Sequence, residues 1–75
     1  MSGHVGMSPS RRSRRAVSDE AVRRIRAAVV LDGQSRTMLA LRCSADVLHD
    51  ALAAGGTVMV DTAERLEARA LELWP

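Results

Sequence analysis

Apolar residues recur at helical spacing in four parts of the chain, and this pattern predicts a small all-α domain with four helices. The first predicted helix covers residues 18–31, with Ser18 as its N-cap and Gly33 suited to the left-handed position after its end. Its apolar residues repeat every three or four positions and define one buried side: Ala21, Val22, Ile25, Ala28 and Val29.

The stretch 35–52 predicts two short helices separated by a tight turn. Ser35 is placed to cap the first, and Ser44 is placed to cap the second. Arg42 and Cys43 interrupt the apolar pattern between them. The buried residues are expected to be Met38 and Leu41 before the break, then Val47, Leu48, Ala51 and Leu52. The spacing therefore predicts a corner rather than one continuous helix through residues 34–54.

The pattern of the remaining residues predicts elements that pack against the preceding helices. Gly55-Gly56 is expected to end the second short helix, and residues 57–60 are β-prone, either covering the core or pairing with a partner chain. Asp61 is expected to cap a last helix with Glu64 at its third position. The buried stripe of that helix is Ala63, Leu66, Ala70 and Leu73.

The run CSADVLHDAL resembles the turn and recognition helix of lambda-repressor-like helix-turn-helix proteins. The following GGTVMVDTAERLEARALEL is similar to the continuation of Lac-repressor-type headpieces, and the likeness covers about residues 21–73. Arg42 stands where that family usually has the turn Gly, and Met38 where it usually has Ala. The resemblance implies that helix 44–54 enters the major groove of double-stranded DNA. The residues expected to face the bases are Ser44, Ala45, Asp46, His49 and Asp50.

Charge is distributed unevenly along the chain. Residues 1–42 contain nine Arg and three acids (+6), whereas residues 43–75 contain two Arg and six acids (−4). Residues 1–17 show no apolar period and include RRSRR, so they are predicted to be a disordered arm in front of a domain at 18–75. The arm is interpreted as a phosphate contact, with a solvated tail as the alternative. The predicted phosphate contacts are Arg11, Arg12, Arg14, Arg15, Arg36 and Arg42.

The residue content argues against an enzyme, a cofactor or a metal site. One Cys permits no internal disulfide, and the two His and the Cys lack metal-site spacing. Asp46 and Asp50 with His49 resemble an acid–base set, but a helix-start carboxylate and an exposed carboxylate explain the two acids more simply. No apolar run is long enough to span a bilayer, and no signal peptide is recognised, so we expect a cytoplasmic protein, which would be nucleoid-associated if it binds DNA.

Two functions remain open from the sequence. The first is a sequence-specific DNA-binding repressor acting as a homodimer, with Leu71 and Trp74 as the tentative interface. A position at the edge of the core would explain Leu71 and Trp74 as well as a dimer interface does. The second is a protein-binding inhibitor or adaptor that uses the acidic face of Asp46, His49 and Asp50 against a basic partner.

Overall fold

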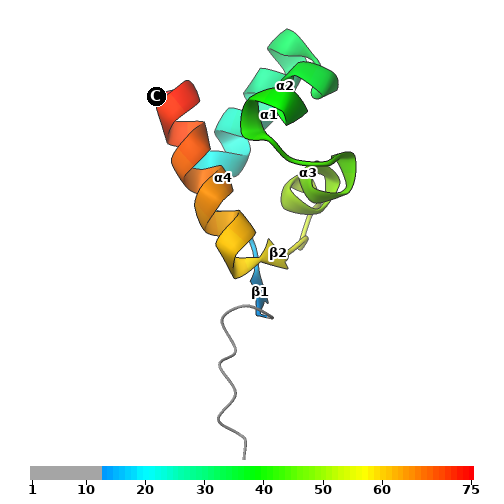
Figure 1. Cartoon of the computed structure of the whole chain (residues 1–75), viewed down its shortest axis with the longest axis vertical. Coiled ribbons are helices and arrows are strands. Elements are labelled where there is room, and N and C mark those ends of the chain that lie inside the picture. The colour runs from blue at the N-terminus through cyan, green and yellow to red at the C-terminus, as the bar shows by residue number, and fades with distance from the viewer. Residues whose placement is uncertain (1–12) are drawn as a thin grey trace, which may run out of the picture.

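A computed structural model describes residues 13–75 of the chain, and Arg11, Arg12 and the rest of the predicted arm up to residue 12 lie outside this range. The elements follow in the order β1 (Arg14–Arg15), α1 (Asp19–Asp32), α2 (Gln34–Leu41), α3 (Ala45–Leu52), β2 (Val58–Met59) and α4 (Val60–Leu73). Figure 1 shows α4 and α3 on opposite sides of the molecule, with the two short strands below them. The predicted four-helix, mainly α-helical fold is confirmed.

The core lies where α1, α2, α3 and α4 meet. Its largest fully buried apolar side chains are Ile25, Leu41 and Leu66, one from each of three helices. The predicted stripes supply most of the remaining buried positions, which include Ala21, Leu48, Ala51, Ala63 and Ala70. Burial of such side chains is the main favourable contribution to folding in a domain of this size.

A glycine joins the first two helices. Gly33 has φ 95°, its amide donates to the Val29 carbonyl (2.9 Å), and its own carbonyl accepts from the buried Thr37 hydroxyl (2.9 Å). Gly33 therefore ends α1 and also begins α2 at Gln34. The prediction that Ser35 caps this helix is wrong, because the backbone of Gly33 already occupies the cap position.

The N-terminal boundary of the domain also differs from the prediction. Arg14 and Arg15 pair antiparallel with Met59 and Val58 of the same chain, and Val17 is buried with 4 % exposure. Residues 13–17 therefore belong to the fold, and the prediction that placed them in a disordered arm is wrong. A strand of two residues is too short to show the alternation by which strands are recognised.

The same strand pair sets the start of the last helix. The Val60 amide donates to the Ser13 carbonyl (3.1 Å), and α4 begins at Val60 with Met59 as its N-cap. Asp61 is therefore not the cap that was predicted. It lies in the first turn of α4, where its carboxylate still favours the positive end of the helix.

The predicted corner between α2 and α3 is confirmed. After Leu41 the backbone of Arg42 turns left-handed (φ 55°, ψ 49°), and the amides of Arg42 and Cys43 donate to the Leu39 and Met38 carbonyls (3.2 and 3.1 Å). This is the bonding of a Schellman motif, which usually has glycine at the left-handed residue. The Ser44 hydroxyl then accepts from the Val47 amide (3.2 Å) and begins α3 as predicted.

Candidate nucleic-acid interface

One side of α3 faces away from the core. Leu48 and Ala51 are buried, while the opposite side of the helix is open to solvent. The predicted base-facing residues are brought together on that open side: Ser44, Ala45, Asp46 and His49 are exposed, and the Asp50 side chain is 48 % exposed. The corner at Arg42 directs α3 away from α2. The exposed side of α3 is therefore accessible to a DNA groove.

Arg14 of β1 lies beside the C-terminal half of this helix. Its guanidinium is 3.6 Å from the Asp50 carboxylate and donates to the Thr57 side chain (3.2 Å) and the Thr57 carbonyl (2.6 Å). Arg14 is therefore held by the fold rather than carried on a free arm. It also offsets one of the two acids on the outward face of α3, which reduces the repulsion that face would exert on a polyanion.

Arg15 has a structural role that differs from the predicted phosphate contact. Its guanidinium binds both carboxylate oxygens of Glu67 (2.7 and 2.9 Å), and one of those oxygens also accepts from the Ser18 amide (2.9 Å). The hydrogen bond from Arg15 lowers the pKa of Glu67, and partial burial opposes that shift. The same bond raises the pKa of Arg15. This ion pair attaches β1 and the start of α1 to α4.

Arg36 and Arg42 remain available for contacts, since both are exposed and neither side chain has a hydrogen-bond or ion-pair partner within residues 13–75. Arg26 of α1 behaves differently. Its guanidinium donates to the Leu52 carbonyl at the end of α3. This bond links α1 to the end of α3.

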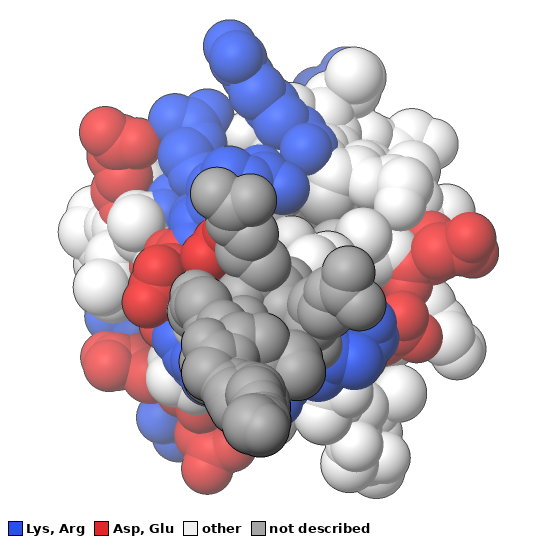
Figure 2. Space-filling view, turned by 60° about the horizontal axis from the view of Figure 1, so that its bottom comes forward, with Lys and Arg blue, Asp and Glu red and all other residues white. Residues whose placement is uncertain are grey.

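Two further arginines next to the corner were missed by the sequence analysis. Arg65 and Arg69, one turn apart on α4, donate to the carbonyls of Leu41 (2.7 Å) and Ala40 (2.9 Å) at the end of α2. With Arg42 they line a hollow of about 340 Å³. Figure 2 shows a patch of arginine side chains above the grey residues, with acidic side chains towards both edges of the view. Only the packing of α4 against α2 reveals this grouping.

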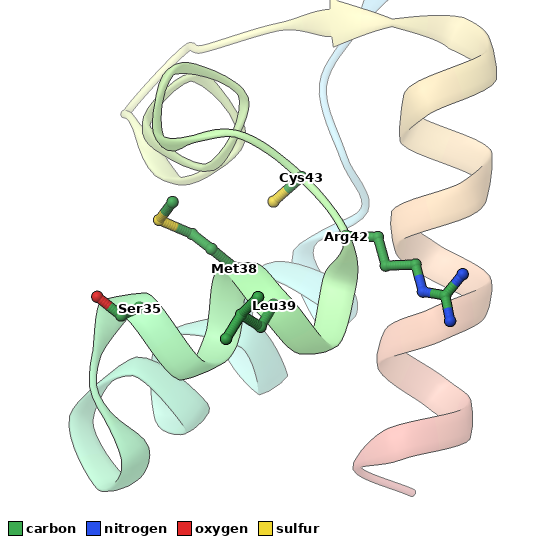
Figure 3. Close-up of a pocket in the computed structure, with 5 residues that line it drawn as sticks. All are labelled: Ser35, Met38, Leu39, Arg42 and Cys43. Carbon is green, nitrogen blue, oxygen red and sulfur yellow. The ribbon is translucent and has the colours of Figure 1, made fainter.

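A second hollow, of about 600 Å³, lies on the other side of α2. Figure 3 shows Met38 and Cys43 on the side towards α3, whereas the Arg42 side chain extends towards α4. Burial raises the pKa of the Cys43 thiol, and the charge of Arg65 opposes this shift. A thiol with a raised pKa is a poor nucleophile.

The tentative dimer residues lie in different surroundings. Leu71 is 49 % exposed, whereas Trp74 packs partly against the core and its carbonyl accepts from the Arg24 side chain (2.8 Å). Of the two, Leu71 alone offers a largely exposed apolar side chain. Other exposed apolar side chains lie on α1 and α2: Val30, Leu31 and Leu39.

No protein family, characterised protein or solved structure is significantly similar to this chain. Within the described range, no helix combines the length and the apolar character needed to cross a membrane. Across residues 13–75, no three His, Cys, Asp or Glu side chains gather as metal ligands would.

Proposed function

We propose that this protein is a sequence-specific DNA-binding regulator whose α3 helix enters the major groove. The observation that carries the proposal is the corner at Arg42, after which Ser44, Ala45, Asp46 and His49 project together from the surface of a short helix. The major groove admits an α-helix, and recognition helices are exposed on a packed domain in the same way as α3.

The arrangement of charge around α3 supports this proposal. Arg14 is fixed beside one end of the helix, and Arg42 lies two residues before its N-cap. In the sequence, Arg11 and Arg12 are separated from the strand that carries Arg14 by Ser13 alone. Arginines on both sides of a reading helix would bind phosphates and hold the helix in register on the duplex.

The side chains on α3 offer specific chemistry to base edges. The Asp46 carboxylate can accept from the amino group of cytosine, and the His49 ring can donate to guanine or to a phosphate. An acid in the groove lowers affinity for every sequence, but it penalises sites that lack a matching donor more strongly. We therefore expect modest affinity with discrimination at the base pairs that these two residues contact.

A protein partner is the second candidate. Asp46 has no ion-pair partner within residues 13–75, and a single exposed acid beside His49 suits a basic surface. The contact between Arg14 and Asp50 weakens this candidate, because it offsets one of the two acids on the face that would bind a basic partner. A DNA-binding role also implies a protein of the cytoplasm and its nucleoid.

The test is binding of the full chain to duplex DNA, measured by fluorescence anisotropy across a range of salt, followed by selection of preferred sites from a random library. We expect binding that weakens steeply with salt and a recovered consensus site. His49→Ala should reduce the preference for that site over a scrambled duplex, whereas His4→Ala, the matched control, should leave the preference unchanged. Absence of binding at low salt would reject the proposal and favour the protein partner.

A further inference from the structure

The hollow between the end of α2 and the middle of α4 is lined almost entirely by positive charge. Its lining residues are Leu41, Arg42, Arg65 and Arg69, and Leu41 itself is fully buried. None of the described residues that line the hollow carries a negative charge. Three of its four lining residues are therefore arginines, and the hollow is positively charged.

Two of the three arginines are positioned by the fold. Arg65 and Arg69 each donate one N–H to a carbonyl in the last turn of α2, at 2.7 and 2.9 Å. A guanidinium has five N–H donors, so these bonds leave donors on both side chains uncommitted. Arg69 also pairs with Glu72 (2.9 Å), whose side chain is 68 % exposed. Three arginines and one glutamate give this cluster a net charge of +2 (3 − 1).

The third arginine occupies a position that its backbone does not favour. Arg42 is the one non-glycine residue with positive φ among residues 13–75. Left-handed backbone is costly for a residue with a Cβ, and such residues concentrate at functional sites. Neither the turn, which favours glycine, nor an ion pair explains an arginine here. Its side chain extends towards α4, the helix that carries Arg65 and Arg69 (Figure 3).

We propose that Arg42, Arg65 and Arg69 together bind one phosphate of a nucleic-acid backbone. Guanidinium groups match the geometry of phosphate oxygens, and an oxyanion between them would relieve the repulsion of three like charges. Because the Arg42 side chain extends towards α4, the bound phosphate would lie between the end of α2 and the middle of α4 (Figure 3). This inference rests on the proposed DNA-binding function and assigns to it a phosphate anchor.

The experiment measures the slope of log affinity against log salt for a mixed-sequence duplex, using the full chain. Arg42→Gln keeps the left-handed backbone of a residue with a Cβ and removes the charge, so we expect weaker binding and a slope lower by up to about 1. Arg42→Gly should show the same loss with an unchanged or higher Tm, because glycine suits the turn. Arg42→Lys should retain most of the slope. The matched control is Arg23→Gln, an exposed arginine of α1, which should bind as the wild type does.

A double variant tests whether the arginines share one phosphate. If they do, Arg42→Gln with Arg69→Gln lowers the slope by no more than about 1, whereas separate phosphate contacts would lower it by about 2. Circular dichroism checks that the double variant remains folded, since Arg69 also binds the end of α2. A wild type that binds DNA beside an Arg42→Gln variant with the same affinity and slope overturns this site alone. A wild type that fails to bind overturns the proposed function.

Discussion

At the scale of single residues, the contact between Arg15 and Glu67 is the most specific ion pair of the described fold. Two hydrogen bonds from the guanidinium and one from the Ser18 amide converge on one carboxylate. Arg15 and Glu67 are 52 positions apart in the sequence, so the pair connects the two ends of the domain. Bidentate geometry and partial burial set it apart from ordinary surface pairs, which contribute little.

Glu67→Gln should lower the Tm at neutral pH by a few degrees. Arg15 holds the folded-state pKa of Glu67 below its ordinary value of 4.5, so the charged pair stabilises the fold above that value. This stabilisation is lost as the pH falls through the lower, folded pKa. The Tm difference between wild type and variant should therefore be largest near neutral pH and shrink in acid.

Thermal melts followed by circular dichroism at several pH values measure this difference. Glu64→Gln is the matched control, because it removes one exposed charge from the same helix without removing a hydrogen bond described above. A Tm difference for Glu67→Gln that stays constant between neutral and acid pH would contradict the pKa argument.

The residues of the candidate site were predictable only where their own helix carried the signal. Ser44, Ala45, Asp46 and His49 follow from the apolar stripe of α3, because the side opposite a buried stripe is exposed. Arg65 and Arg69 gave no such signal. They become part of the site because α4 packs next to the end of α2, a tertiary relation that no local pattern encodes.

At the scale of elements, the helices were predictable and their starts were not. Each helix has an apolar stripe long enough to register the helical period, and all four were predicted. The starts of α2 and α4 depend on backbone bonds from Gly33 and Ser13 rather than on the predicted caps Ser35 and Asp61. A side-chain cap is one of several ways to satisfy the first amides of a helix.

The strand β1 gives the element-scale prediction. A chain of residues 13–75 should keep the Tm of the full chain within a few degrees, whereas a chain of residues 18–75 should be strongly destabilised. The longer truncation removes β1, the Arg15–Glu67 pair and the buried Val17, whose burial alone contributes about 1.5–3 kcal/mol. That is a large share of the stability available to a domain of this size.

Denaturant unfolding of the two truncated chains beside the full chain measures these effects. Equal stability of the 18–75 chain and the full chain would show that β1 is dispensable. The comparison also determines which truncation can test the N-terminal arginines for DNA binding. Only a truncation that removes residues before Ser13 leaves the described fold complete.

At the scale of the whole molecule, the core is small and several apolar side chains remain outside it. Leu71 on α4 is half exposed, and we propose that it forms part of a homodimer contact. Pairing of two domains would bury apolar surface that one domain leaves in water. It would also present two α3 helices to DNA, as dimeric regulators do.

Leu71→Asp should convert the protein from dimer to monomer, because a buried unpaired carboxylate is costly in an apolar interface. Light scattering coupled to size-exclusion chromatography measures the mass. Leu31→Asp is the matched control, since Leu31 is an exposed leucine at the end of α1 (82 %), and this variant should remain dimeric. If Leu71→Asp has the same mass as the wild type, Leu71 is not part of an interface.

The pairing of β1 with β2 has a consequence for the biosynthesis of the protein. Arg14 and Arg15 are synthesised before their partners. Met59 and Val58 follow more than forty residues later, and Glu67 later still. The first strand therefore stays unpaired in the nascent chain until β2 has been synthesised. The native domain can form only after α4 has also left the exit tunnel, because Glu67 of α4 binds Arg15.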